Sequence, residues 1–327
     1  MITRTLNALI VVALVNAIQN VYAVDTSPIA VSNSLPIAFG NGLPKPKSAD
    51  ILEQGQTKLT ITGFVQSNAS DSGSDQELLI IDGESHSIDF DFRFGITPRL
   101  ELNAQIQLIR HTAGNLDGLI EKWHGVFSLP DGDRDLFAQD QLQFSYSNAE
   151  QSNSITESQS GLSNLQIGVA YQLLQNNKLN IAVGSGVSLP TGNASSLLGS
   201  DKSSFHISVL TSSAGLRKLG WHANFGVLRI GDDELFGIKT KANTWFTSLG
   251  THWQIKERLR LSAQVDGHGA VFESNIDEIS KSAWQLALAA EYSLKGSDKY
   301  IQIFFSEDLS VNRATDFSFG ISWSTQF

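Results

Sequence analysis

Three aspartates in the middle of the chain have a spacing that could bind a metal ion. Asp131, Asp133 and Asp135 match the D-x-D-x-D pattern of a calcium loop, in which carboxylate oxygens surround the cation. The pattern then fails, because Leu136 stands where the loop needs a glycine and Leu142 where it needs a bidentate glutamate. We therefore interpret this stretch as a solvated turn, and we predict no metal site and no cofactor.

A second candidate is a base beside a hydroxyl on one strand. His206 and Ser208 are two residues apart, and this His-x-Ser arrangement resembles that of lipid A deacylases, where the imidazole activates the serine. Phe205, Ile207 and Val209 alternate with them, so we expect these three to face lipid and the pair to face a lumen. No third orienting group is identifiable in the sequence. We predict that the protein is not an enzyme.

The last strand of the chain indicates which fold holds these residues. Apolar side chains at Phe317, Phe319, Ile321 and Trp323 alternate with small or polar ones, up to the terminal Phe327. This strand resembles the signature by which Gram-negative outer-membrane β-barrels reach their insertion machinery. The resemblance implies that machinery, outer-membrane lipid and lipopolysaccharide as partners.

The same alternation recurs along the chain and predicts an all-β fold. We expect a transmembrane antiparallel β-barrel of the outer-membrane type with about twelve strands. The expected strands are 58–66, 88–96, 100–108, 165–173, 179–189, 205–209, 221–227, 245–255, 259–265, 284–294, 301–305 and 317–327. A soluble periplasmic β-sandwich is the alternative, but large aromatic residues near the strand ends favour two interfacial girdles. These aromatic residues are Tyr171, Trp221, Trp253, Tyr292 and Trp323 near the periplasmic ends, and Trp245 and Trp284 near the outer ends.

Short and long connections alternate between the strands, as periplasmic turns and external loops do in outer-membrane barrels. The short ones are 97–99, 175–177, 214–220, 256–258 and 295–299, and the long ones are 67–85, 111–160, 190–203, 231–241, 269–282 and 308–315. The alternation holds only if the strand-like stretch Gln141 to Ser147 lies inside the 111–160 loop and outside the membrane.

The first 56 residues precede the barrel at 57–327. Residues 1–23 are typical of a signal peptide, because Arg4 precedes a short apolar core and Ala23 ends a cleavage site. A membrane-anchoring helix is the alternative, although the apolar run is shorter than the ~20 residues of a span. Residues 24–56 mix apolar residues with prolines, which cannot complete a strand ladder. We expect this periplasmic N-terminal segment to pack on or inside the periplasmic mouth, or to dock a periplasmic partner.

Composition excludes several classes of function. The chain of 327 residues contains no cysteine, which removes disulfides and thiolate chemistry and suits passage through an oxidising compartment. Its net charge of −10 argues against a nucleic-acid partner, because phosphate binding needs a basic surface.

Several short motifs are spread over the mature chain. They are Ile81-Asp82-Gly83-Glu84, Leu116-Asp117-Gly118, Trp123-His124, Leu129-Pro130-Asp131-Gly132-Asp133-Arg134-Asp135, Pro190-Thr191-Gly192 and Glu307-Asp308. Together they resemble the motif set of domain-of-unknown-function family 3187, a group of predicted exported or outer-membrane proteins of Gram-negative bacteria. This resemblance implies no activity. Pro190-Thr191-Gly192 is also similar to outer-membrane channels linked to aromatic-compound uptake.

The 111–160 loop is the place where we expect function. Its 50 residues exceed what connectivity demands, and Gly118 to Phe127 has near-helical apolar spacing that could form an amphipathic helix in the lumen or over the mouth. Such a loop would set what passes, and a structural plug is the alternative. The candidate residues are Trp123, His124, Asp131, Asp133, Arg134 and Asp135 in the loop and Asp91, Arg93 and Glu101 in the lumen.

The sequence therefore predicts a passive outer-membrane channel gated by the 111–160 loop. Its solute is small, and an apolar or aromatic compound is a candidate. The predicted lumen residues carry both charge signs, so no ionic selectivity follows. A structural or interaction protein without transport is the second hypothesis, and a lipid-modifying barrel enzyme is the third.

Overall fold

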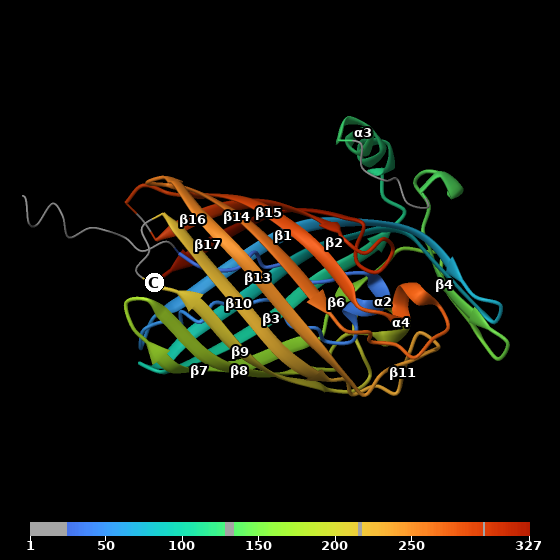
Figure 1. The fold of residues 1–327 in the computed structure, drawn as a ribbon. Helices are drawn as coiled ribbons and strands as arrows, with labels where there is room; N and C mark the ends of the chain where they lie inside the picture. Colours follow the sequence, from blue (N-terminus) through green and yellow to red (C-terminus); the bar gives the residue numbers. More distant parts are fainter. Residues whose placement is uncertain (1–24, 128–133, 215–217, 297) are drawn as a thin grey trace, which may run out of the picture.

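Twelve antiparallel strands close into a barrel in the computed structural model, which describes residues 25–127, 134–214, 218–296 and 298–327 (Figure 1). In barrel order the strands are β1 (Thr57–Gly73), β2 (Glu77–Thr97), β3 (Leu100–Thr112), β7 (Leu165–Gln175), β8 (Leu179–Leu189), β9 (Ser204–Ser213), β10 (Leu219–Arg229), β13 (Asn243–Lys256), β14 (Leu259–His268), β15 (Ala283–Ser293), β16 (Lys299–Asp308) and β17 (Phe317–Gln326). Pairing of β1 with β17 closes the ring. The predicted fold class and strand number are confirmed. The signal peptide predicted at 1–23 lies outside the described residues.

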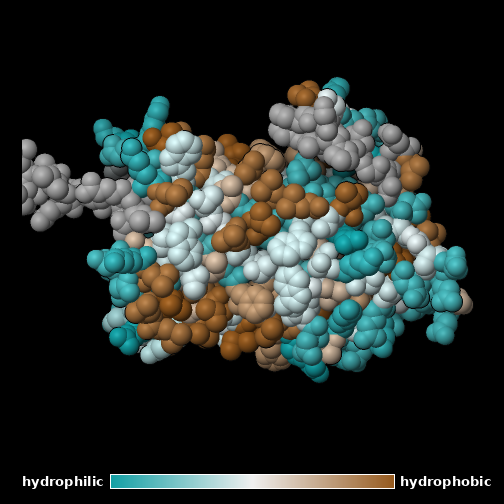
Figure 2. Space-filling model, viewed as in Figure 1, coloured by the Kyte–Doolittle hydropathy of each residue, from teal (hydrophilic) through white to brown (hydrophobic). Residues whose placement is uncertain are grey.

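Side chains alternate between the two faces of the wall, as the period of two requires. On β2, Ile88, Phe90 and Phe92 are 37–46% exposed, whereas Asp89 between them is 1% exposed. Figure 2 shows apolar side chains over the barrel wall and mainly hydrophilic ones at the end where the long loops lie. The wall therefore has an apolar outer face and a polar inner face.

The two ends of the barrel differ. Short turns and the C-terminus occupy one end, called here the turn end, and the longer connections occupy the other, the loop end (Figure 1). The predicted loop at 67–85 is wrong, because β1 and β2 continue through it and pair as far as Gly73 and Leu78. Pairing continues there because it satisfies the backbone groups of both strands beyond the barrel wall.

The segment 111–160 contains small elements of its own. They are α3 (Asp117–Phe127), the 3-10 turn η1 (Arg134–Leu136), β4 (Gln143–Asn148), β5 (Ser152–Ile155) and β6 (Gln159–Leu162). β4 pairs with the extension of β2 beyond the barrel, and β5 pairs with β4. The strand-like stretch at Gln141 to Ser147 therefore lies outside the barrel ring, as the alternation of connections predicted.

The N-terminal segment, residues 25–56, runs inside the barrel (Figure 1). Its ascending arm follows β14 from the turn end. Arg260 donates to the backbone carbonyl of Asp25, Gln264 exchanges two hydrogen bonds of 2.9 and 3.0 Å with the backbone of Ile29, and Asn33 contacts His268 at 2.8 Å. The three wall residues are four apart on one strand, and so are their three partners. The arm is therefore extended and parallel to β14.

The segment turns at the loop end and returns along β2 and β3. A single helical turn, α2 (Pro36–Phe39), forms the apex, with a proline in its first turn where the missing N–H costs nothing. The descending arm contacts Asp89 through Lys45 and Glu101 through the backbone N–H of Leu52, and then enters β1. The segment thus crosses the lumen twice. The sequence analysis expected the segment on or inside the periplasmic mouth. In the structure the segment continues through the lumen as far as the loop end.

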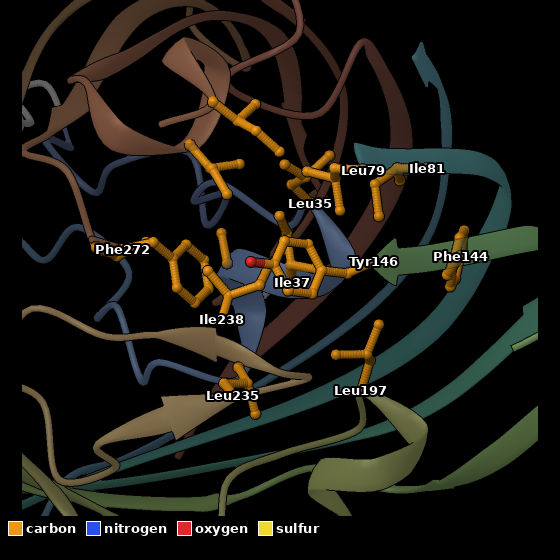
Figure 3. Close-up of a cluster of buried hydrophobic side chains, with 14 of the residues drawn as sticks. Leu35, Ile37, Leu79, Ile81, Phe144, Tyr146, Leu197, Leu235, Ile238 and Phe272 are labelled. Atoms are coloured by element: carbon orange, nitrogen blue, oxygen red, sulfur yellow. The ribbon is translucent and has the colours of Figure 1, made fainter. Parts of the chain in front are cut away.

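The largest apolar core lies at the loop end, around α2 (Figure 3). Leu35 and Ile37 of the segment pack there against side chains from six connections or strand extensions. The partners include Leu79, Ile81, Phe144, Tyr146, Leu197, Leu228, Leu235, Ile238, Phe272, Ile276 and Ile279, which bring in the short hairpin β11 (Glu234–Leu235) with β12 (Ile238–Lys239) and the helix α4 (Asp277–Ser280). The outer loops therefore close over the mouth by packing on the apex of the segment.

Among the described residues, no helix is long and apolar enough to cross a membrane.

Phe327 supports a prediction about assembly. Its backbone N–H and C=O both bond to Thr57, at 2.9 and 2.8 Å, so the last residue fastens the seam between the first and last strands. Deleting Phe327, or combining Trp323→Asp with Phe327→Asp, should leave export intact and block insertion. A charge on the lipid face costs roughly 2–4 kcal/mol near the midplane and less near the interface. Heat-modifiable protein in the outer-membrane fraction measures insertion, with Phe327→Tyr as control. Normal insertion of the charged variant would contradict the barrel's membrane role.

Candidate functional site

The lumen wall carries charges of both signs, and the N-terminal segment covers them. The wall residues Asp89, Glu101, Gln105, Arg260, Gln264, Asp266 and Glu291 are all buried. They alternate with outward apolar residues, which is why the sequence pattern locates them. Because the segment excludes water from them, each buried charge needs a partner.

Of the three lumen residues proposed from sequence, Arg93 and Glu101 form a two-pronged ion pair. Arg93 donates to the two carboxylate oxygens of Glu101 at 2.8 and 2.6 Å. Glu101 also accepts the backbone N–H of Leu52 at 2.8 Å, and Arg93 donates to the carbonyl of Asp50 at 3.1 Å. Asp91 lies half-buried on the same inner face of β2. The pair therefore holds the descending arm against the wall.

Two lysines of the segment complete this attachment. Lys45 contacts Asp89 at 2.5 Å, and Gln105 donates to the same carboxylate at 3.0 and 3.1 Å. The Lys47 ammonium donates to Asn103 on β3, while its backbone exchanges two hydrogen bonds of 2.7 and 2.8 Å with Asn224 on β10. Lys47 thus connects the segment to two separate parts of the wall.

Little space remains between the segment and the wall. Three cavities there measure about 30, 70 and 20 Å³. A single water needs roughly 10–15 Å³ of such volume, so these cavities hold a few waters each and no organic solute. The lumen is closed in this conformation.

Helix α3 forms where the apolar spacing predicted a helix, but it does not enter the lumen. Figure 1 shows it beside the barrel near the loop end. Trp123 and His124 lie in this helix and Asp135 lies in η1, although their side chains are not described. Asp131 and Asp133 lie outside the described residues. In the part of the chain that is described, no group of three or more His, Asp or Glu side chains is placed to hold a metal ion.

Arg134 is the loop candidate whose side chain the structure describes. Its side chain is 3% exposed and donates to Asp117 at 3.0 Å and to Ser67 on β1 at 3.1 Å. A carboxylate oxygen of Asp316 lies 3.5 Å away and also accepts the backbone N–H of Ala69. Arg134 therefore ties the 111–160 loop to the barrel rim. Its three partners come from three other segments of the chain.

Asp82 lies in the same rim, on the part of β2 that extends beyond the barrel. It is 3% exposed. Burial raises the pKa of this carboxyl, the charge of Asp117 adds to the rise and Arg134 opposes it, and the pKa reaches about 7. The folded rim therefore prefers the protonated carboxyl.

His206 and Ser208 point into the barrel, as the alternation predicts, and Phe205, Ile207 and Val209 are 48–57% exposed on the outer face. The His206 ring lies 6.0 Å from the Phe246 ring in an edge-on arrangement. This neighbour is apolar and supplies no proton acceptor.

Sequence reasoning missed a chain of hydrogen bonds across three neighbouring strands. His222 Nδ1 lies 2.8 Å from His252 Nε2, and the two outer nitrogens contact Ser248 at 3.2 Å and Ser262 at 2.9 Å. The residues come from β10, β13 and β14, so only the strand register reveals the pair. All four side chains are buried and satisfy one another.

The contacts of Arg134 predict its role. Arg134→Met should loosen the rim, because removing one partner of a buried pair leaves the other charge uncompensated, at roughly 3–5 kcal/mol. Hydrogen exchange of residues 113–120 and 134–142 should accelerate, and Arg99→Met in an exposed turn should leave it unchanged. Equal protection in both variants would mean that Arg134 does not hold the loop.

The shifted carboxyl of Asp82 predicts a pH dependence. Its folded pKa of about 7 exceeds the ordinary value of 3.8, so its contribution to stability is complete below pH 3.8 and is lost as pH rises through about 7. Exchange in the rim, corrected for intrinsic rates, should be slower at pH 6 than at pH 8. Asp82→Asn should reduce this difference. A difference that Asp82→Asn leaves intact would assign the pH dependence to other groups.

Comparison with known proteins agrees with this architecture. The COG4313 outer membrane channel from Pseudomonas putida F1 is 13% identical, the match covers 86% of this chain and 99% of that chain, and the TM-score is 0.55. The NanC porin is 10% identical, with 81% and 97% covered and a TM-score of 0.46. The first similarity shows that this chain has the fold of an outer-membrane channel.

No curated protein sequence matches the chain. A family model described as "Protein of unknown function (DUF3187)" matches residues 2–327. The chain therefore belongs to the DUF3187 family.

Proposed function

We propose that this protein is an outer-membrane channel for a small solute and that its own N-terminal segment closes it. The observation that carries the proposal is the double crossing of the lumen by residues 25–56, beside which cavities of about 20 to 70 Å³ lie. A solute can pass only if the segment moves. The channel fold of the barrel supports transport as the reason for having a lumen at all.

The segment is a better candidate for the gate than the 111–160 loop. Helix α3 stands beside the wall, whereas both arms of the segment lie in the path of a solute (Figure 1). The loop acts at the rim, where Arg134 joins it to β1 and to Asp316. In this proposal the segment blocks the lumen, and the loop stabilises the mouth around it.

With the segment in place, the charges named here balance one another. Arg93 with Glu101 and Arg260 with Glu291 are paired within the wall, and Lys45 of the segment balances Asp89. Removing the segment would add the charges of Asp89 and Asp91 to the open lumen, together with those of the two internal pairs. Because the two internal pairs are neutral, the unpaired Asp89 and Asp91 would make the open lumen favour a cationic or neutral solute over an anion.

A structural role without transport is the second candidate. The apolar core between α2 and the outer loops favours it, because such packing makes a stable plug. A conductance measurement on variants of the segment separates the two functions.

The direct test removes the segment. A mature variant lacking residues 28–54 should conduct several-fold more than the unmodified protein in planar bilayers, because the lumen of a twelve-stranded barrel is narrow and one inserted segment fills it. Excision of residues 115–140 should leave conductance low. A rise only after the second excision would make the loop the gate, and no rise in either variant would favour the structural role.

A milder variant tests whether the attachment controls opening. Lys45→Ala with Lys47→Ala should increase the frequency of open events and the release of a small sugar from liposomes, since it removes the ammonium partners of Asp89 and Asn103. Lys178→Ala, in an exposed turn, is the matched control. Identical opening in both variants would show that these contacts do not hold the closed state.

An enzymatic role has a separate test. His206→Ala with Ser208→Ala should leave the lipid A mass profile of a producing cell unchanged, because both side chains face the lumen and the imidazole packs on Phe246. Loss of a modification that the unmodified protein introduces would make the protein a lipid-modifying enzyme.

A further inference from the structure

A large hollow lies on the outer face of the wall, not in the lumen. It measures about 680 Å³ and extends across β17, β1, β2, β3 and β6. Gly63 lies at its floor, with Ile88 and Ile321 as its neighbours on the adjacent strands. A Cβ atom added to Gly63 would meet nothing within 4 Å, so the space above this glycine is open. The hollow is apolar, and it faces the lipid side of the wall.

Arg110 and His86 border this hollow toward the loop end. They are cross-strand partners on β3 and β2, and they lie two residues beyond the apolar pair Leu108 and Ile88. His86 is eleven residues from Thr97 at the turn end, which at ~3.3 Å per residue and a tilt of ~40° is about 28 Å along the barrel axis. The apolar band of such barrels is about 25 Å tall. Both residues therefore lie at the level of lipid headgroups.

The charge at this border is positive. Arg110 is exposed and has no hydrogen-bond or ion-pair partner among the described residues. An acidic group, Glu84, lies next to His86, with a carboxylate oxygen 2.8 Å from the imidazole Nε2. Glu84 is 1% exposed and its carboxylate also accepts the backbone N–H groups of Asn115 and Leu116 at 2.7 and 2.5 Å. Its charge is thus satisfied beneath the surface, and no acidic side chain that the structure describes pairs with the guanidinium of Arg110.

We infer that this hollow binds an anionic membrane lipid, with an acyl chain over Gly63 and the headgroup phosphate at Arg110. A guanidinium binds phosphate through two parallel N–H donors, and an apolar hollow next to it accommodates the chain of the same molecule. The inference rests on the proposed outer-membrane location but not on conduction. Lipid binding and conductance are measured separately, so the failure of one proposal can be distinguished from the failure of the other.

A second hollow on the wall supplies a matched control. It measures about 480 Å³ and includes Trp253, Leu261 and Ala290, and all of its lining residues are uncharged. It offers apolar space without a cation at its border. A lipid that binds only through its chains should use either hollow, whereas an anionic headgroup should select the one beside Arg110.

The test uses native mass spectrometry of the full mature protein, titrated in detergent with phosphatidylglycerol or with a diacylglycerol of the same chains. Arg110→Ala should weaken binding of one phosphatidylglycerol about tenfold and leave diacylglycerol binding unchanged, since a charge-assisted bond of this kind is lost. Gly63→Leu, which fills the floor, should weaken binding of both lipids. Ala290→Leu, which fills the control hollow, should change neither. Heat modifiability verifies that each variant is folded.

Each result bears on the inference. Equal phosphatidylglycerol binding by the unmodified protein and by Arg110→Ala would overturn the headgroup assignment. Unchanged binding in Gly63→Leu would overturn the site itself, and a loss in Ala290→Leu alone would transfer it to the other hollow. Normal conductance in Arg110→Ala, with weakened lipid binding, would support the site as separate from the channel.

Discussion

Paired charge in a water-poor lumen is the constraint on which the rest of this structure depends. Strands with an apolar outer face must place their polar residues inside, because side chains alternate with a period of two. Once a segment fills the lumen, those polar residues lose their water and need partners. Asp89, 1% exposed, obtains its partner from Lys45, and Glu101, also 1% exposed, pairs with Arg93 of the wall and accepts the backbone N–H of Leu52. The composition of the segment therefore complements the wall.

The segment meets this constraint without becoming a strand. Every strand of the ring already pairs on both sides, so the wall has no free edge to which a further strand could add. Side chains of the wall bind the segment instead, as Gln264 does with the backbone of Ile29. The prolines of residues 28–46 suit this position, because they lack the N–H that a ladder would use. At the apex the requirement changes, and Leu35 and Ile37 meet apolar loop residues.

The sequence allowed the strands to be predicted because their periodicity is local. All twelve strands and the exclusion of Gln141 to Ser147 follow from alternation and from the lengths of the connections. The extension of β1 through Ser67 to Gly73 was missed because its residues are polar or small on both faces, which removes the signal. Helix α3 was expected from its spacing, but a helical pattern contains no information about which side of the wall it occupies.

The candidate site was less predictable, since its contacts are distant in sequence. Asp25 meets Arg260, and Asn33 meets His268, each 235 positions away. The pair of His222 and His252 depends in the same way on the register of separate strands. Individual lumen residues such as Arg93 and Glu101 could be placed on the inner face, but their partners in the segment could not. The sequence alone therefore did not show that residues 25–56 fill the lumen.

The path of the segment also determines the direction in which it can leave. Both arms reach the turn end, one at Asp25 and the other where Gln56 continues into β1, while only α2 reaches the loop end (Figure 1). Withdrawal toward the turn end moves a folded hairpin along the barrel axis and threads no chain through the outer loops. Withdrawal toward the loop end would have to displace the packed connections around Phe272 and Tyr146 first. Retraction toward the turn end also removes Leu35 and Ile37 from the apolar core, so the loops lose the surface on which they pack. In the proposed channel, opening of the lumen and loosening of the apolar core at the loop end are therefore one coupled event, because the same segment supports both.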